Sequence, residues 1–470
     1  MLKVADVFEA VSGQIPGGAE QPITGAVHDS RNAQSGNLFV ALKGEHTDGH
    51  DFVAEAFSKG AILAFVQREI PGDFPILDLR AGRQITDFKT QYPFCLLVDD
   101  CLFALQKTAS FWRRKLNLRV IGITGSVGKT TTKELTAEVL SQHYLTFKSA
   151  ANFNNEIGLP LNVLSITERH ERAVLEMGFY VPGEIALLAE IALPVIGVIT
   201  NIGTVHAERA GSQEAIYSGK AELVRALPKD GIAILNLDDP FVKRMADETQ
   251  ASVFWYGLDS KADLWADEIE GMGLDGVRFK LHYAGETLHV RIPLIGRHSV
   301  HTALRAAAVG LVEGLSWGEV LAGLRIGNPQ LRLVAVPGKN GSLLLDDTYN
   351  ASPESTVAAL NLLEELDGRK VAVLGDMLEL GPYEEQGHRV VGNLAAKVAD
   401  ALITVGPRAR IIAETAKAAG LDAKSIAQFD DSQQALGFLK DSLAKGDVVL
   451  VKGSRAVQMD KIVPELEARE

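Results

Sequence analysis

The chain has 470 residues, of which 46% are apolar and 23% are charged, so a globular protein of several domains is expected rather than a disordered or fibrous chain. Its formal net charge of −13 disfavours a general nucleic-acid or membrane surface, because both kinds of surface need a basic face. We expect a cytoplasmic monomer of three domains that binds no nucleic acid and does not insert into a membrane.

Short β-like runs at 38–42 and 61–66 flank a helical segment at 52–59 near the start of the chain. This alternation predicts a small α/β domain over residues 1–113. The domain is expected to close with a helix near 102–115, because the basic residues at the end of this segment suit a helix C-terminus.

The start of the chain argues against export. Asp6 and Glu9 interrupt the apolar run that a signal peptide would need. Cys95 and Cys101 are too few for a disulfide framework or a set of metal ligands, and we expect them to be buried thiols.

Residues 114–322 repeat a pattern of apolar strand and helix, which predicts a doubly wound, mostly parallel sheet. Its strands are expected at 118–124, 173–176, 195–201 and 231–236. Apolar and polar residues then alternate at 277–283 and 287–293, so an antiparallel extension of the same sheet is expected.

The strongest motif is Thr124-Gly-Ser-Val-Gly-Lys-Thr-Thr-Thr132, which follows an apolar strand and opens a helix. In such a P-loop the backbone N–H groups and the positive end of the helix dipole converge on phosphate. Lys129 is expected to reach the outer phosphates and Thr130 to bind magnesium, although Ile123 stands where the general pattern has its first glycine. The motif predicts nucleotide contacts by Thr124, Gly125, Ser126, Val127, Gly128, Lys129, Thr130 and Thr131.

Other polar residues follow the strands of this domain. Glu176 ends a strand at the edge where open α/β sheets bind ligands, so it is placed to hold magnesium, but such a glutamate is also typical of a solvated cap. Taken alone, His206 is typical of a loop and Lys220 of a solvated helix face. Asn236 and Asp239 fit either a polar turn or a nucleotide contact.

Residues 323–470 again alternate strands and helices, which predicts a Rossmann-like α/β domain. Its strands are expected at 343–346, 371–374, 401–405 and 448–451. Polar clusters follow three of these strands, at 346–353, 374–380 and 451–455, so one edge of the sheet is expected to carry a site. Each cluster alone is also typical of turn chemistry.

Together these motifs resemble the Mur ligase family over almost the whole chain. Near the N-terminus, Asp29-Ser-Arg31 and the segments 37–44 and 47–52 look like the family's UDP-muramoyl-peptide segment. They imply substrate contacts by Ser30, Arg31, Lys43, Asp48 and His50. The family's phosphate loop is normally preceded by Thr-Gly, which accounts for the departure at Ile123.

For the central domain the resemblance implies ATP and two magnesium ions. Thr130, Glu176, His206 and Lys220 match metal-site positions, and Lys129, Glu176, His206 and Lys220 match catalytic positions. The lysine that matches Lys220 is carbamylated in related ligases, which requires a neutral amine and therefore a lowered pKa. Further nucleotide contacts are implied for Asn201, Asn236, Arg297, His298, Thr302, Arg332, Asp347 and Tyr349.

The chain departs from the family pattern beside these positions. Ser299 and Thr302 stand where members usually have asparagine, and Leu331 stands before Arg332 where they have glycine.

The C-terminal motifs look like those of the family member that adds D-alanyl-D-alanine. They imply contacts with this dipeptide by Asn350, Ser352, Asp376, Glu379, Lys452, Ser454 and Arg455. In the implied reaction, ATP phosphorylates the terminal carboxylate of UDP-N-acetylmuramoyl-tripeptide, and the dipeptide amine attacks the acyl phosphate. A closure hinge is expected near 320–330.

Three alternatives stay open at this point. They are a sibling ligase that adds a diamino acid to UDP-muramoyl-dipeptide, a polyglutamate-adding relative, and a P-loop NTPase in which hydrolysis drives a conformational change.

Overall fold

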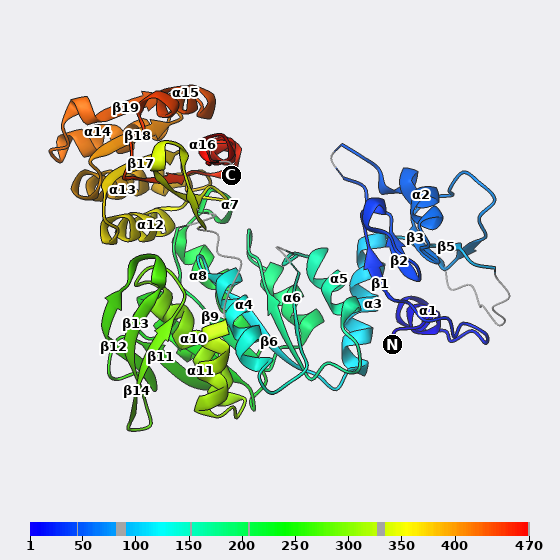
Figure 1. Ribbon diagram of the computed structural model, residues 1–470. Coiled ribbons are helices and arrows are strands. Elements are labelled where there is room, and N and C mark those ends of the chain that lie inside the picture. Colours follow the sequence, from blue (N-terminus) through cyan, green and yellow to red (C-terminus); the bar gives the residue numbers. More distant parts are fainter. Residues whose placement is uncertain (45, 81–90, 151–152, 205–206, 327–333, 469–470) are drawn as a thin grey trace.

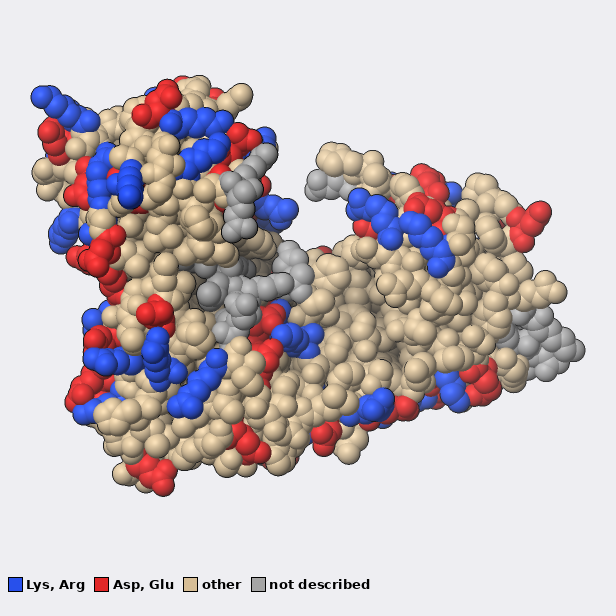
Figure 2. Space-filling model, viewed as in Figure 1, with Lys and Arg blue, Asp and Glu red and all other residues tan. Residues whose placement is uncertain are grey.

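The computed structural model describes residues 1–44, 46–80, 91–150, 153–204, 207–326 and 334–468. The chain forms an N-terminal, a central and a C-terminal α/β domain, each built on its own sheet, which confirms the predicted fold class. Figure 1 shows the N-terminal domain in blue and the C-terminal domain in yellow to red, both adjoining the cyan and green central domain. The two outer domains face each other across an open hollow in the space-filling view (Figure 2).

The N-terminal domain has a five-stranded parallel sheet of order β1-β2-β3-β5-β4. Its strands are β1 (Gly25–Val27), β2 (Asn37–Val40), β3 (Leu63–Val66), β4 (Ile76–Asp78) and β5 (Phe94–Leu97). Its helices are α1 (Val4–Ser12), α2 (Val53–Ser58) and α3 (Cys101–Lys115). The two cysteines are buried and unpaired, as predicted.

The central domain has a nine-stranded sheet of order β14-β13-β12-β11-β10-β9-β6-β8-β7. Its parallel part contains β6 (Arg119–Thr124), β7 (Thr146–Lys148), β8 (Arg172–Glu176), β9 (Ile196–Ile199), β10 (Ile232–Asn236) and β11 (Ser252–Gly257). Strand β12 (Leu264–Gly271) joins it to an antiparallel extension of β13 (Val277–Tyr283) and β14 (Glu286–Ile292). Strand β6 lies between β8 and β9, so residues that follow all three strands meet at one edge.

Helices cover both faces of the central sheet because its inner strands are apolar on both sides (Figure 1). One face packs against α4 (Lys129–Leu140), α10 (Ser299–Val312) and α11 (Trp317–Ile326). The other packs against α5 (Gly158–Ser165), α6 (Glu184–Ala192) and α8 (Gln213–Arg225). Short helices α7 (Ala207–Ala210) and α9 (Pro240–Arg244) follow β9 and β10. In the described part of the chain, no helix has the length and apolar character needed to cross a membrane.

The C-terminal domain has a six-stranded sheet of order β15-β16-β20-β17-β18-β19, in which only the β15–β16 pair is antiparallel among the described pairings. Its strands are β15 (Val334–Pro337), β16 (Leu343–Asp347), β17 (Arg369–Gly375), β18 (Ala401–Val405), β19 (Ile426–Phe429) and β20 (Asp447–Lys452). Its helices are α12 (Pro353–Glu365), α13 (Glu384–Val398), α14 (Arg410–Ala418), α15 (Ser432–Ser442) and α16 (Val463–Leu466).

Candidate active site

The loop between β6 and α4 has a conformation that requires glycine. Gly125 has φ 144° and Gly128 has φ 84°, both in the region that side chains disfavour. A Cβ on Gly125 would lie 1.8 Å from Thr200 Oγ1. The side-chain amide of Asn201 accepts from Val127 N–H (3.1 Å) and donates to the Val127 carbonyl (3.0 Å). The loop is therefore fixed around the N-terminus of α4, where N–H groups attract phosphate.

Two side chains from the start of α4 make different contacts, one with this loop and one with the end of β8. Lys129 Nζ donates to the carbonyls of Gly125 (2.8 Å) and Ser126 (3.2 Å). Thr130 Oγ1 donates to Glu176 Oε2 at 2.9 Å, so the predicted metal-binding hydroxyl and carboxylate meet across neighbouring elements.

Glu176 is only 2% exposed, and its neighbours hold it in place. Asn154 Nδ2 donates to Glu176 Oε1 at 2.9 Å, and the Glu176 N–H donates to Ser149 Oγ at 3.1 Å. The Ser149 carbonyl in turn accepts from the fully buried Lys133. Sequence reasoning missed Asn154, Ser149 and Lys133, and the adjacent asparagines at 154 and 155 were the one available signal.

Lys220 lies on α8 with 1% exposure, behind the phosphate loop. Its Nζ donates to the Gly125 carbonyl at 3.1 Å and lies 4.7 Å from the centre of the Phe179 ring. Burial and then the nearby charge of Lys129 lower the pKa of Lys220 well below its ordinary value. A lowered pKa increases the fraction of neutral amine, and only the neutral amine can react as a nucleophile.

A cavity of about 180 Å³ lies between the central and C-terminal domains. Its walls include Ser126, Val127, Gly128, Thr130, Thr131, His298, Ser299, Thr302, Asp347, Asn350, Ser352 and Lys452. The structure thus brings predicted nucleotide residues from both domains to one place. Asn236 is buried, and its Nδ2 donates to the Thr200 carbonyl at 3.3 Å. Arg297, by contrast, is exposed.

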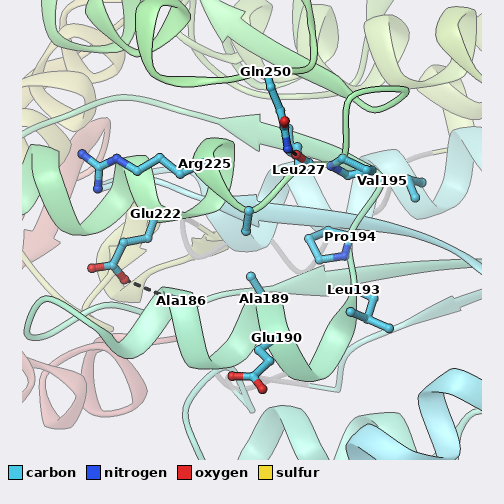
Figure 3. A pocket seen from close by; sticks show the side chains of 12 residues that line it. Ala186, Ala189, Glu190, Leu193, Pro194, Val195, Glu222, Arg225, Leu227 and Gln250 are labelled. Carbon is cyan, nitrogen blue, oxygen red and sulfur yellow. Dashed lines mark hydrogen bonds between the residues drawn. The ribbon is translucent and has the colours of Figure 1, made fainter.

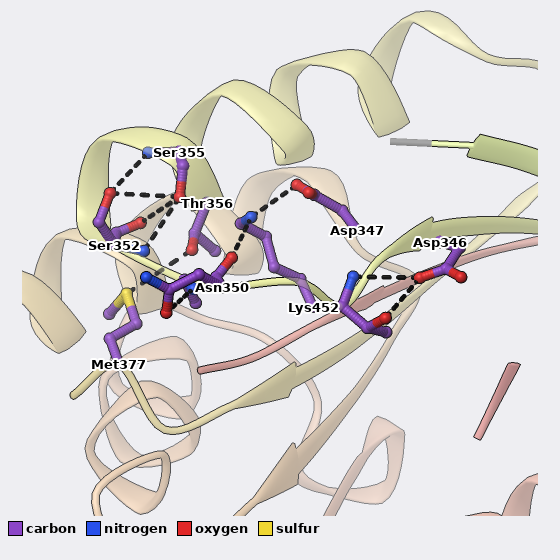
Figure 4. Close-up of polar contacts among 10 residues, drawn as sticks. Asp346, Asp347, Asn350, Ser352, Ser355, Thr356, Met377 and Lys452 are labelled. Atoms are coloured by element: carbon purple, nitrogen blue, oxygen red, sulfur yellow. Dashed lines mark hydrogen bonds and ion pairs between the residues drawn. The ribbon is translucent and has the colours of Figure 1, made fainter. Parts of the chain in front are cut away.

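The C-terminal wall of the cavity is a network of polar side chains (Figure 4). Lys452 is 2% exposed, and its Nζ donates to Asp347 Oδ2 (2.6 Å) and to the Asn350 carbonyl (2.9 Å). Ser352 caps α12 by accepting from Ser355 N–H at 3.2 Å. These contacts tie the ends of β16 and β20 to the start of α12.

Other predicted dipeptide residues support loops of the same domain. Asp376 is buried, which raises its pKa, and it accepts from Ala409 N–H at 2.7 Å. Ser454 Oγ accepts from Leu378 N–H at 2.9 Å. The Glu379 carbonyl accepts from the N–H of Glu208 in the central domain, at 3.1 Å. Tyr349, Asn350 and Arg455 are exposed and can meet a ligand directly.

The predicted N-terminal residues form a separate group on the N-terminal domain. Ser30 Oγ donates to Glu55 at 2.9 Å, and Arg31 pairs with Asp29 at 2.6 Å. Lys43 is exposed and forms a backbone bridge with Asp48.

His50 in this group has partners at both ring nitrogens. Its Nδ1 donates to Asp48 at 2.6 Å, and its Nε2 accepts from Gln67 N–H at 2.9 Å. Hydrogen bonds from His50, first from its backbone, lower the pKa of Asp48 to about 2. His50 and Asp48 therefore hold the loop on which Lys43 is exposed, whereas Arg31 is exposed on the separate turn Ser30–Asn32. The predicted residues His206 and Arg332 lie outside the described part of the chain.

A larger hollow, of about 550 Å³, lies between α6, α8 and the chain before β9 (Figure 3). Its walls are mostly apolar and include Leu193, Pro194 and Leu227, while Glu222 is engaged with the N–H of Ala186 at 2.9 Å. It contains none of the predicted site residues. The smaller cavity is therefore the better candidate for the active site, because predicted site residues of both domains line it.

Known proteins resemble this chain in sequence and in structure. Family models match it as the Mur ligase middle domain (residues 123–310), the Mur ligase, glutamate ligase domain (331–455) and the Mur ligase family, catalytic domain (22–76). The UDP-N-acetylmuramoyl-tripeptide:D-alanyl-D-alanine ligase of Bacillus subtilis is 36% identical over 98% of both chains. MurF from Acinetobacter baumannii matches with TM-score 0.84 and 31% identity over 98% of both chains. MurF ligase from Thermotoga maritima in complex with ADP matches with TM-score 0.77 and 28% identity over 94% of this chain and 96% of that one.

Proposed function

The chain belongs to the Mur ligase family, and we propose that it joins D-alanyl-D-alanine to UDP-N-acetylmuramoyl-tripeptide with ATP, as a step of peptidoglycan synthesis. The observation that carries this proposal is 36% identity to a ligase of that name over 98% of the chain. The arrangement of the cavity supports the same proposal, because the phosphate loop of the central domain and the edge of the C-terminal sheet both line it.

The proposed reaction has two steps. An oxygen of the tripeptide's terminal carboxylate attacks the γ-phosphorus of ATP, the bond to the β,γ-bridging oxygen breaks, and ADP leaves. The neutral amine of D-alanyl-D-alanine then attacks the acyl carbon, inorganic phosphate leaves with the bonding electrons, and the nitrogen loses a proton. Two anions must meet in the first step, so the loop N–H groups and Lys129 would stabilise the charge on the transferred phosphoryl group.

Thr130 and Glu176 fit a magnesium ion at the phosphates. Their oxygens lie 2.9 Å apart at the start of α4, and magnesium prefers oxygen ligands completed by water and phosphate. Within the described ranges no three His, Cys, Asp or Glu side chains form a metal-binding group, which fits such a site better than a cage made only of protein. When bound, the ion would polarise the γ-phosphoryl group. His206 is a further proposed ligand, from the family resemblance alone.

We propose that Lys220 carries a carbamate. The lone pair of its neutral amine would add to the carbon of CO₂, and the nitrogen would release a proton to water. Burial and the charge of Lys129 favour the neutral amine, and the resulting anion would offset the charge of Lys129. Its oxygens would suit a second magnesium ion.

The domains are proposed to divide the substrates between them, with boundaries near 113 and 322. Exposed Arg31 and Lys43 would contact the UDP-muramoyl-peptide, and Asn350 and Arg455 the dipeptide. The outer domains face each other across the hollow, so a closing movement is expected (Figure 2). Its proposed hinge, near 320–330, lies partly outside the described residues. An X-ray scattering profile unchanged by saturating ATP and muramoyl-tripeptide would contradict closure.

We also propose that the protein works in the cytoplasm, where ATP is supplied, and as a monomer. Sedimentation of the purified protein at micromolar concentration tests the second point.

The decisive experiment measures phosphate release from ATP and magnesium with UDP-N-acetylmuramoyl-tripeptide, with and without D-alanyl-D-alanine. Release that needs both, with a pentapeptide product, is expected. Activity on UDP-muramoyl-dipeptide with a diamino acid would assign the chain to a sibling ligase. Release that depends on no amine would favour the NTPase alternative.

A further inference from the structure

Arg305 is a buried arginine for which the described part of the chain provides no acidic partner within ion-pair distance. It lies on α10 with 4% exposure. Its Nη2 donates to Thr302 Oγ1 at 2.8 Å, whereas the contacts of Nη1 with the Thr200 carbonyl and Tyr256 Oη are both long, at 3.5 Å. Among the described residues, its Nε has no hydrogen-bond partner and no carboxylate lies within ion-pair distance. Such burial is costly unless an anion compensates the charge.

The guanidinium lies beside the phosphate loop. A Cβ on Gly128 would be 3.3 Å from Arg305 Nη2, so the cation is next to the residue that precedes α4. A buried guanidinium thus lies behind the loop at the end where α4 already presents the positive end of its helix dipole. A polyanion bound in front of the loop would compensate this charge.

Thr302 connects Arg305 to the cavity. Thr302 lines the cavity together with Gly128 and Thr131. Because its oxygen accepts from Arg305, its own proton stays available for a second partner. The arginine therefore orients this hydroxyl as a donor toward a ligand in the cavity.

We propose that Arg305 is a positioning residue of the ATP site, which favours the polyphosphate by its charge and orients Thr302 to donate to the bound nucleotide. This inference rests on the proposed ATP-dependent function. The contribution of the Arg305 charge to binding affinity should increase with the number of phosphates on the nucleotide. The contribution of the Thr302 hydroxyl should be similar for every nucleotide that reaches it.

The test measures the dissociation constants of ATP, ADP and AMP by calorimetry for the full chain and for Arg305→Met, Arg305→Lys and Thr302→Val. Arg305→Met should weaken ATP binding by about tenfold or more and AMP binding by less than about threefold. Arg305→Lys should recover most of the preference for ATP over AMP. In turnover, Arg305→Met should raise the KM for ATP much more than it lowers kcat.

Arg113 offers a matched control, because it is another buried arginine but donates to the carbonyls of Ala192 (2.7 Å) and Leu118 (2.8 Å). Arg113→Met should lower the melting temperature and leave the ATP-to-AMP ratio unchanged. Equal losses for ATP and AMP in Arg305→Met would overturn the inference. If that variant does not fold, Thr302→Val decides, and unchanged nucleotide affinity would reject the positioning role. A wild-type protein that binds neither ATP nor ADP would instead reject the proposed function.

Discussion

The two sides of the active-site region each bury a lysine, but in opposite surroundings. On the central domain, Lys220 is 1% exposed and contacts a carbonyl and an aromatic ring, with no carboxylate in ion-pair range among the described residues. On the C-terminal domain, Lys452 is 2% exposed and pairs with Asp347 at 2.6 Å. Burial alone therefore does not indicate what a lysine does. The Lys452 amine is held in an ion pair, whereas burial lowers the pKa of the Lys220 amine.

The largest expected effect comes from breaking the pair. Lys452→Met removes the cation that pairs with the buried Asp347 at 2.6 Å and should destabilise the C-terminal domain by about 3–5 kcal/mol, measured by denaturant unfolding. Lys452→Met combined with Asp347→Asn should recover part of this loss. A cost below about 1 kcal/mol for the single variant would contradict the structural role of the pair.

The matched change on the central side should affect catalysis instead. Lys220→Met should lower kcat/KM on the order of 100-fold or more without lowering the melting temperature, because it removes a desolvated amine and leaves no unpaired carboxylate. Short carboxylic acids should restore part of the activity of Lys220→Ala. A fully active Lys220→Ala enzyme would contradict the proposed role of Lys220. Restored activity with short carboxylic acids would support the carbamate.

The support of Glu176 offers a finer test on the same side. Asn154→Ala removes the donor to Glu176 Oε1, so the magnesium concentration for half-maximal activity should rise by about tenfold. Ser355→Ala removes the side-chain acceptor of the Ser352 N–H at the start of α12; it is the control on the C-terminal side and should leave this concentration unchanged. The same magnesium requirement in both variants would argue against metal binding at Glu176.

The smallest effect is a pH dependence with a defined sign. Because the folded state lowers the pKa of Lys220, the unfolded state binds more protons between that pKa and about 10.4. The stability of the wild type should therefore rise with pH relative to Lys220→Met, by up to about 1.4 kcal/mol per pH unit in that window. Unfolding in CO₂-free buffers at several pH values measures this slope. A slope of opposite sign would mean that the folded protein raises the pKa.

Sequence reasoning predicted best where a short segment determines its own geometry. The loop from Thr124 to Thr132 encodes its turn, its helix start and its polar groups in one stretch, and the predicted strands around it are present. The edge strands β7, β15 and β19 were not predicted, because each has only three or four residues, too few to show a periodic pattern.

Side chains whose role depends on distant partners were missed for a different reason. Asn154 gains its role from Glu176, 22 positions away, and Arg305 from residues that only the sheet brings near it. The sequence also could not show that Asp376 and His50 use their polar atoms within their own domains. Partners of this kind follow from tertiary packing and not from local patterns.

The contact between Gly125 and Thr200 limits how this site can change by mutation. A side chain at Gly125 would overlap Thr200 Oγ1, and the φ of 144° at Gly125 also disfavours any other residue. A substitution there would therefore be expected to damage the loop before it altered the shape presented to a bound molecule. An inhibitor that makes its main hydrogen bonds to the backbone at this position should consequently select few resistance mutations at the contact itself.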